Sequence, residues 1–231
     1  MAGLLVTAVV WGYKMTPSSL PCVALDYTIE DAGERMYLTE TELTQLLREE
    51  NLYPVGRQLD RVSLHRIEQA VAHHPMVRTA ECYLTPRNEV QVELTQRIPL
   101  MRVHTQGDTY IVDTDRRVMQ ARAAVRDSVL TVTGTVGVQM AVTQLADFAE
   151  WLQHSRYWRT RVHHLHVQAP SRVYVYLRDA GTPRVLLGAM HGYPRKLDKL
   201  RTFLEYGEEA IQGKQYTELD VRFHGQVIGR K

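Results

Sequence analysis

Apolar and polar residues alternate in short segments of the first half of the chain, and this period of two predicts β-strands. The clearest alternation places Val90, Val92 and Leu94 on one side and polar residues on the other. Residues 22–29 and 77–84 are predicted strands as well, and a Thr-Pro-Arg-Asn turn separates the second strand from the third. We therefore predict three strands in this region, the last two joined by that turn.

Between the first two strands, apolar residues recur every three or four positions, which predicts two helices. Thr39 and Glu42 have the spacing of a capping box, in which each side chain bonds the backbone N–H of the other residue. Ser63 is a candidate N-cap of the second helix, and Pro75 ends that helix because the residue before a proline avoids the α region. The predicted order is β-α-α-β-β, which we assign to a domain at residues 22–97.

The rest of the chain, residues 98–231, predicts a mixed β domain with two helices, so the fold class is α+β. The first helix has an apolar stripe that runs from Ala141 to Leu152, and the second begins near Lys196. Strands are predicted at 162–167, 173–177 and 184–187.

The last predicted strand includes residues 218–223, where apolar side chains alternate with polar ones. We expect the apolar set to pack into the domain and the polar set to face solvent. The apolar set is Leu219, Val221 and Phe223, and the polar set is Glu218, Asp220 and Arg222. A strand at the edge of a sheet has unpaired N–H and C=O groups, so a partner segment can add to it as a further strand.

The only continuous apolar run lies at the N-terminus, at residues 3–13, with no charged side chain before Lys14. As a helix this run reaches about 17 Å, less than the hydrocarbon core of a bilayer, about 30 Å. We interpret residues 1–21 as the outer half of a membrane anchor, whose start lies upstream, followed by a linker. A buried N-terminal strand or short helix is the alternative. The anchor residues are Leu4, Leu5, Val6, Val9, Val10 and Trp11.

Composition excludes several classes of protein. The chain has 28 Lys and Arg against 26 Asp and Glu, and this net charge of +2 gives no argument for a nucleic-acid partner. Two cysteines, Cys22 and Cys82, are too few for a disulfide-rich module or a multi-cysteine zinc site. A bond between them stays open, and Cys82 is favoured as a small buried strand residue.

The sequence predicts no catalytic or metal centre. The densest histidine group is His163, His164 and His166, and the last two share one face of a strand. Two such histidines can bind a metal, but no Asp, Glu or Cys lies nearby in the sequence, so solvent-facing histidines are favoured. The common nucleophile, zinc-protease and phosphate-loop motifs are absent. We therefore predict no enzyme activity, no cofactor and no small-molecule substrate.

One set of residues is more specific than the periodicity. Its members are Gly56, Ile67, His74-Pro75-Met76-Val77, Ala80, Val90, Val92 and Gln96-Arg97-Ile98-Pro99. This set resembles the POTRA domain of the bacterial cell-division protein FtsQ, also called DivIB, and the variant with Cys22 and Tyr53-Pro54 is similar to the Bacteroidetes branch. Further on, residues 130–134 and the terminal segment are similar to the same family, and the likeness covers 22–228.

The resemblance implies a single-pass protein of the inner membrane, with a periplasmic POTRA domain and a periplasmic β domain, located at the division septum. It implies a non-enzymatic scaffold that links early and late division proteins during septum formation. The expected partners are FtsB- and FtsL-like bitopic division proteins and other divisome components, bound through the terminal strand. The residues to which we carry this role over are Tyr216, Asp220, Arg222, Phe223, Gln226 and Val227.

A second class of function stays open, that of a POTRA-containing component of a protein export or outer-membrane assembly system. Such a component needs a membrane barrel of many alternating strands, usually with repeated POTRA modules. Only about 134 residues follow Arg97, and they include two predicted helices, which disfavours this class.

Overall fold

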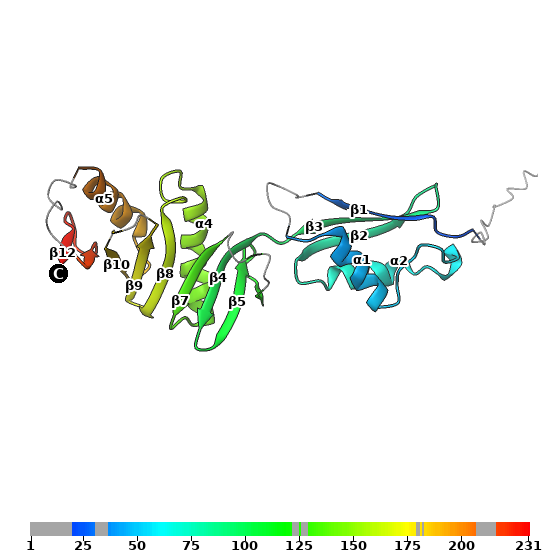
Figure 1. The fold of residues 1–231 in the computed structure, drawn as a ribbon, viewed down its shortest axis with the longest axis horizontal. Coiled ribbons are helices and arrows are strands. Elements are labelled where there is room, and N and C mark those ends of the chain that lie inside the picture. Colours follow the sequence, from blue (N-terminus) through cyan, green and yellow to red (C-terminus); the bar gives the residue numbers. More distant parts are fainter. Residues whose placement is uncertain are drawn as a thin grey trace, which may run out of the picture. The chain divides into compact units, whose positions relative to one another are not determined.

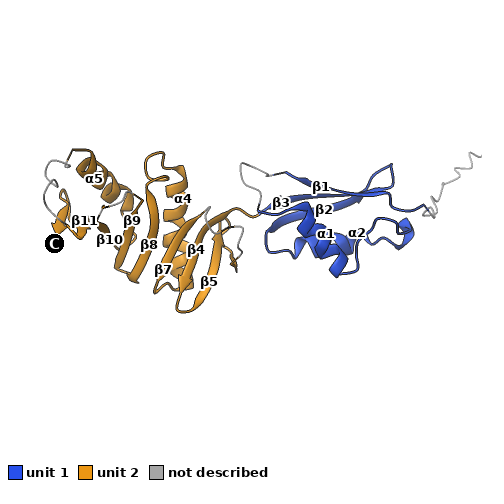
Figure 2. Cartoon of the chain, in the orientation of Figure 1, with its two compact units in different colours: residues 1–96 blue, residues 97–231 orange. Residues whose placement is uncertain are grey.

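The computed structural model describes residues 20–30, 37–121, 125, 129–178, 181, 183–206 and 216–231. The expected membrane-anchor residues, from Leu4 to Trp11, lie outside these ranges. The chain divides between Gln96 and Arg97 into two compact units, which Figure 2 colours separately. Among the described residues, no helix has the length and apolar character needed to cross a membrane.

The part of the first unit that the structure describes is a three-stranded sheet with two α-helices against one face (Figure 1). Its central strand, β3, is parallel to β1 and antiparallel to β2. The predicted β-α-α-β-β order is therefore confirmed. The elements are β1 (Ala24–Ile29), α1 (Glu40–Glu49), the short 3-10 helix η1 (Leu59–Arg61), α2 (Leu64–Ala72), β2 (Val77–Leu84) and β3 (Glu89–Gln96).

Both helices of this unit begin at the predicted caps. Thr39 Oγ1 accepts a hydrogen bond from Glu42 N at 3.2 Å, and Glu42 Oε2 accepts one from Thr39 N at 3.3 Å, which completes the capping box. Ser63 Oγ accepts from Arg66 N at 3.4 Å at the start of α2. These side chains satisfy N–H groups that have no partner within the helix. The helices bury Leu43, Leu47, Ile67 and Val71, and β3 buries Val90, Val92 and Leu94.

In its described residues, the second unit is built on one mixed sheet of nine strands (Figure 1). Its order across the sheet is β12-β11-β10-β9-β8-β7-β4-β5-β6. The strands are β4 (Pro99–Thr105), β5 (Asp108–Asp113), β6 (Val118–Gln120), β7 (Leu130–Gly134), β8 (Val162–Ala169), β9 (Arg172–Leu177), β10 (Arg184–Gly188), β11 (Glu218–Asp220) and β12 (Ile228–Arg230). The helices are α3 (Val138–Met140), the π-helical η3 (Ala141–Leu145) and α4 (Ala146–His154), which follow one another directly, and α5 (Tyr193–Tyr206).

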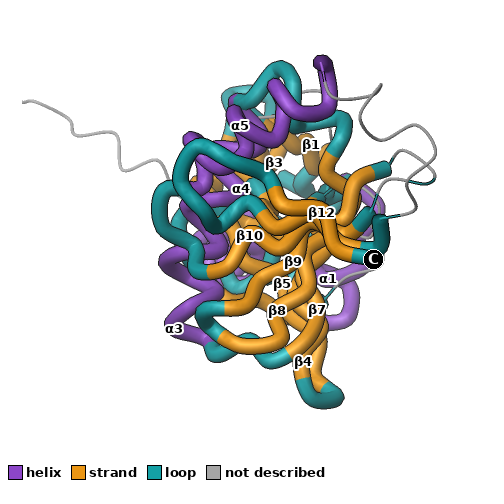
Figure 3. Tube along the Cα trace, turned by 90° about the vertical axis from the view of Figure 1, so that its left-hand side faces the viewer, coloured by secondary structure: helices purple, strands orange, loops and turns teal. Residues whose placement is uncertain are grey.

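Two of the three parallel strand pairs in the described sheet decide where these helices lie; the third, β4 with β7, has β5 and β6 between its strands in the chain. β7 is parallel to β8, and β10 is parallel to β11. Parallel neighbours need a crossover connection, which the segment from α3 to α4 supplies for the first pair and α5 for the second. Both helical segments lie on the same side of the strands (Figure 3), and the core forms between them and the sheet. The main contributors are Met101, Val103, Val132, Leu165, Val175, Val185 and Leu219 from the sheet, and Leu145, Phe148, Leu152, Leu197 and Leu200 from the helices.

The opposite face of the sheet has polar and aromatic side chains in cross-strand rows. Thr131, His164 and Tyr176 are neighbours on β7, β8 and β9, and the rings of His164 and Tyr176 stack with centroids 4.2 Å apart. A register shift between Val162 and His164 interrupts the alternation of β8. Because of this shift, Nδ1 of His163 lies 3.0 Å from Nδ1 of His164, although alternation predicts opposite faces for the two residues.

The two cysteines are free thiols, so the disulfide that the sequence left open is not formed. Cys22 is buried, and its Sγ donates to the carbonyl oxygen of Ala24 at 3.2 Å. Cys82 is half-buried on β2. Burial, with a smaller effect of the nearby Glu68 carboxylate, raises the pKa of Cys82 to about 12.

We expect the Cys82 thiol to react slowly with maleimide at pH 8, because the reactive species is the thiolate and a raised pKa keeps the thiol protonated. The measurement uses a Cys22→Ala variant, so that Cys82 is the only thiol, and compares labelling of the native protein with labelling in urea. Labelling of the native protein should be at least about tenfold slower. Equal rates in the two conditions would contradict the raised pKa.

Candidate partner-binding site at the β12 edge

The C-terminal segment forms two short strands joined by a turn. β11 lies inside the sheet, parallel to β10 and antiparallel to β12, with Glu218 opposite Arg230. β12 is therefore the edge strand (Figure 1). The single terminal strand, predicted from alternation over 218–223 and extended to 216–228 by the family resemblance, is wrong in its extent, because the strand ends at Asp220. The chain returns as β12 after a turn at Gly225, where φ is +72°.

Burial in this segment differs from the predicted alternation. Leu219 and Val221 are fully buried, as predicted, but Glu218 and Asp220 are buried as well, with exposed fractions of 4% and 0%. The expectation that these two carboxylates face solvent is wrong, because arginines from neighbouring segments enclose them. Phe223 is 42% exposed. The expectation that it packs into the core is wrong, because the strand ends before it.

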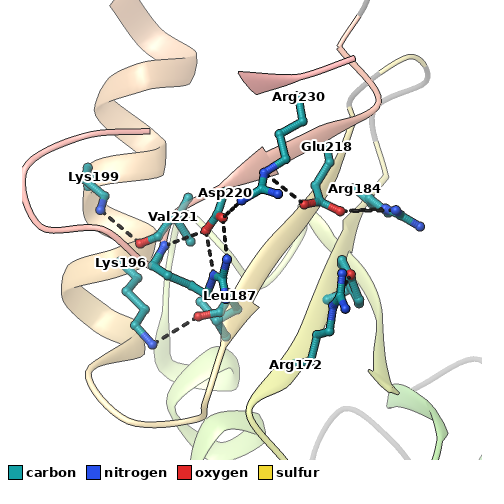
Figure 4. Close-up of polar contacts among 11 residues, drawn as sticks. Arg172, Arg184, Leu187, Lys196, Lys199, Glu218, Asp220, Val221 and Arg230 are labelled. Carbon is teal, nitrogen blue, oxygen red and sulfur yellow. Dashed lines mark hydrogen bonds and ion pairs between the residues drawn. The ribbon is translucent and has the colours of Figure 1, made fainter. Parts of the chain in front are cut away.

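Asp220 lies at the centre of this site (Figure 4). Its carboxylate accepts hydrogen bonds from Arg222 Nε at 2.9 Å and from Arg222 Nη2 at 2.8 Å, which is a two-point pair. It also accepts from Arg230 Nη2 at 2.9 Å and from the backbone N–H of Arg222 at 3.1 Å. A buried carboxylate is costly without partners, and paired guanidinium bonds are among the strongest that it can receive. The burial of Asp220 therefore depends on both arginines.

Glu218 is the second carboxylate of the site and shares an arginine with the first. Arg184 Nε donates to Glu218 Oε2 at 3.2 Å, and Arg230 Nε lies 3.7 Å from Glu218 Oε1. Arg230 therefore bridges the two carboxylates (Figure 4). The Arg184 guanidinium also lies over the Tyr174 ring, 4.9 Å from its centroid, and the Tyr174 hydroxyl accepts from Arg172 Nε at 2.9 Å. The cluster thus joins β9, β10, β11 and β12.

In this cluster the negative charges are buried and the positive charges are partly exposed. The side chains of Arg184, Arg222 and Arg230 are 47%, 40% and 50% exposed, so solvent meets guanidinium groups while the carboxylates lie beneath them. Burial alone would raise the pKa of Asp220. The hydrogen bonds from Arg222 and the charges of Arg222 and Arg230 outweigh that effect and hold the pKa below its usual value. The hydrogen bond to Asp220 is the main cause that raises the pKa of Arg222.

Two lysines of α5 hold the ends of β10 and β11. Lys196 Nζ donates to the carbonyl oxygen of Leu187 at 3.1 Å. Lys199 Nζ donates to the carbonyl oxygen of Val221 at 3.0 Å and to that of Phe223. Burial is the main cause that lowers the pKa of both lysines. These bonds satisfy carbonyl groups at the strand ends and tie the turn after β11 to the helix.

Gly188 makes room for the Arg222 side chain. Gly188 ends β10 with a φ of +77°, and a Cβ at this position would lie 2.7 Å from Cδ and 2.8 Å from Cγ of Arg222. Glycine alone combines this backbone conformation with the space that the arginine stem occupies. Two contacts therefore fix the position of Arg222: its stem packs on Gly188 of β10, and its guanidinium bonds Asp220.

The other residues with a predicted binding role lie around this cluster. Tyr216 is half-buried and its ring contacts Gly229, where a Cβ would lie 2.5 Å from Cε1 of the tyrosine. Val227 packs against the core, and Gln226 is exposed in the turn. The six residues thus occur in one strand–turn–strand segment, and their role in binding stays a prediction. Within the described ranges, His, Cys, Asp and Glu side chains form no group of three or more that could hold a metal ion.

The arrangement offers two means of binding a protein segment. The outer side of β12 has backbone groups that no strand of the described sheet pairs, and a partner strand can bond to them. Beside this edge, Arg184, Arg222 and Arg230 present guanidinium groups, which suit carboxylates on the partner.

Sequence reasoning missed several residues of the site. The role of Arg184 follows from the pairing of β10 with β11, which periodicity does not predict. The same is true of Arg230, Lys196 and Lys199, whose partners come from other elements. Gly188 alone left a signal, since a glycine at the end of a predicted strand suggests a close approach of another group.

Comparison with known families assigns both units. Residues 20–95 match the POTRA-like domain, and residues 98–230 match the family described as FtsQ/DivIB, C-terminal related. The second match spans more than half of the chain. Comparison with curated proteins gave no match.

We expect Asp220→Asn to lower the free energy of unfolding by about 3 kcal/mol, because breaking a buried ion pair leaves its partners uncompensated. The matched control is Asp147→Asn. Asp147 also pairs with an arginine, Arg116 at 2.8 Å, but its side chain is 60% exposed, so its loss should cost less than about 1 kcal/mol. Urea unfolding of the two variants and the wild type measures the difference. Equal losses in the two variants would contradict the role of Asp220.

The pH dependence of this difference follows from the lowered pKa of Asp220. A carboxyl with a lowered folded-state pKa contributes stability that is fully present above its unfolded-state pKa, about 3.9. This contribution is lost as the pH falls through the folded-state pKa. We therefore expect the gap between the wild type and Asp220→Asn to be constant from pH 8 to pH 5 and to shrink below about pH 4. A gap that stays constant down to pH 2 would show that the Asp220 charge does not contribute.

Proposed function

Because the chain belongs to the FtsQ/DivIB, C-terminal related family, we propose that it is a non-enzymatic scaffold of the cell-division machinery. The family domain suggests a role in cell division, and a POTRA-like domain precedes it in the same chain. The observation that carries the proposal is an edge strand, β12, which lies beside three partly exposed guanidinium groups. An open strand edge beside surface cations is suited to binding a segment of another protein.

The partner binds as an extended segment that pairs with the outer side of β12. Main-chain hydrogen bonds to the edge supply affinity, and side-chain contacts select the partner. The buried pairs of Asp220 and Glu218 hold Arg184, Arg222 and Arg230 in place before the partner arrives. Less side-chain freedom is then lost on binding, which favours affinity.

The side chains of the partner next to this edge are acidic. The surface of the cluster is positive because its two carboxylates are buried, so an acidic segment meets guanidinium groups and little repulsion. The exposed Phe223 at the turn gives the partner an aromatic contact in addition.

FtsB- and FtsL-like bitopic division proteins are the partners that this proposal names, together with other divisome components. The scaffold links early and late division proteins during septum formation. It is held in the inner membrane as a single-pass protein by the N-terminal segment, with the two described units in the periplasm at the division septum.

We expect Phe223→Ala to lower the affinity for the periplasmic segment of such a partner by about tenfold, because aromatic side chains are frequent hot spots of interfaces. Since Phe223 is 42% exposed, the midpoint of thermal unfolding should change by less than about 3 °C. Calorimetric titration with the partner segment measures the affinity. Truncation after Gln215 is a poorer test, because it also removes the buried Leu219 and Val221 from the core.

The matched control for this test is Val138→Ala, which shortens another exposed apolar side chain of the same unit, 56% exposed and far from the turn in the sequence. Its affinity for the partner should equal that of the wild type. Two results count against the proposal: undiminished binding by Phe223→Ala, or an equal loss in both variants.

A further inference from the structure

A groove lies on the helical side of the second unit. Its lining comes from the end of α4, from the turn at 155–161 that follows α4, and from the first part of α5, which comes after β8, β9 and β10 in the chain. Its volume is about 360 Å³, which is within the range of ligand sites. The lining residues are Trp151, Ser155, Tyr157, Trp158, Pro194, Arg195, Asp198 and Arg201.

The wall of the groove is aromatic and held in a fixed geometry. Trp158 is 3% exposed, and the Tyr157 ring meets it edge-on with centroids 4.8 Å apart. The guanidinium groups of Arg161 and Arg201 lie over the Tyr157 ring, 4.0 Å and 4.7 Å from its centroid. Trp151 is half-buried, so part of the indole remains open to a ligand. Trp151 is therefore the ring most open to a ligand, while Tyr157 and Trp158 support the wall in a preformed geometry.

Ser155 and Trp158 fix the shape of the turn that supplies this wall. Ser155 Oγ accepts a hydrogen bond from Trp158 N at 3.2 Å, directly after α4 ends. The N–H of Val162 then donates to the carbonyl oxygen of Trp158 at 3.0 Å, which leads the chain into β8. The rings are thus placed by backbone bonds on both sides of the turn, and a ligand does not have to order them.

The charged side chains that line the groove, Arg195, Asp198 and Arg201, are exposed. Neither the Arg195 guanidinium nor the Asp198 carboxylate makes a hydrogen bond or ion pair with another part of the chain that the structure describes. Arg201 Nε is bonded to Glu205 Oε1 at 2.8 Å. A flat apolar wall with a few convergent polar groups is the usual composition of a ligand site.

This groove is separate from the cluster at β12. α5 contributes to both, but with different residues: Lys196 and Lys199 bond carbonyl oxygens of the sheet and the turn, whereas Arg195 and Asp198 line the groove. The cluster at β12 has its carboxylates on the face of the sheet that the helices do not cover. A ligand in the groove therefore leaves the β12 edge free.

We propose that this groove binds an extended, proline-containing peptide segment with a carboxylate beside its prolines. Polyproline II segments dock on aromatic-lined grooves because their conformation is preformed, so little entropy is lost on binding. Their backbone has no internal hydrogen bonds, and Asp198 is placed to accept from an N–H of the segment. Arg195 pairs with the carboxylate of the segment, and the proline rings pack on Trp151 and Pro194.

The proposal is tested by calorimetric titration of the full chain with two synthetic peptides, Ac-Pro-Ala-Pro-Glu-Ala-Pro-amide and the same peptide with Gln in place of Glu. We expect saturable binding of the first peptide and about tenfold weaker binding of the second, as for loss of one charge-assisted pair. With Arg195→Glu, the affinity for the Glu peptide should fall by at least the same factor, and the two peptides should then differ by less than about threefold.

Two further variants keep the test specific. Arg159→Glu makes the same charge change at an exposed position of the neighbouring turn that does not line the groove, and it should bind the Glu peptide within about twofold of the wild type. Asp198→Ala should weaken both peptides alike, because it removes the carboxylate that accepts from a backbone N–H group. Absence of saturable binding by the wild type overturns the proposal, as does equal binding of the Glu peptide by Arg195→Glu and Arg159→Glu.

Discussion

The buried charge of Asp220 is the constraint on which the C-terminal part of the second unit depends. A carboxylate with no exposed surface needs partners, and these come from Arg222 in the turn after β11 and from Arg230 in β12. β11 and β12 have three residues each, so the backbone hydrogen bonds between them are few and give only marginal stability by themselves. The shared carboxylate therefore joins the turn and the edge strand to the body of the sheet. Gly188 belongs to the same arrangement, because a Cβ at its position would collide with the Arg222 side chain in the conformation that bonds Asp220.

The connections between parallel strands give the two faces of the sheet different properties. Because β7–β8 and β10–β11 are parallel pairs, their helical crossovers cover one face, and the core lies there. The other face keeps polar, aromatic and charged side chains in cross-strand rows. α5 contributes to the sheet edge and to the helical layer. Lys196 and Lys199 bond carbonyl oxygens near the strand ends, while Arg195 and Asp198 line a groove of the helical layer. The same helix thus holds the β12 edge in place and forms part of a second candidate binding surface.

Local patterns predicted the first unit well because its elements are decided by neighbours in sequence. The capping pair of Thr39 and Glu42 and the alternation in β3 act within a few residues, and the structure has them as predicted. The terminal segment was predicted less well, since burial of Asp220 depends on arginines from the turn and the edge strand. Periodicity over 218–223 could not show that the strand ends at Asp220. The prediction that His163 and His164 point to opposite faces failed for a related reason, because a register shift interrupts the alternation of β8.

The way in which the site hides its negative charge bears on how it can select a partner. Arginine side chains in water lose much rotamer freedom when they bind a carboxylate, and that loss weakens many surface pairs. Here Asp220 and Glu218 already hold Arg184, Arg222 and Arg230, so part of that cost is met during folding. The remaining guanidinium N–H groups stay available at the surface, each partly exposed. A buried anion that would otherwise be a burden on stability therefore serves to orient cations toward an acidic strand at β12, and stability and recognition depend on the same residues.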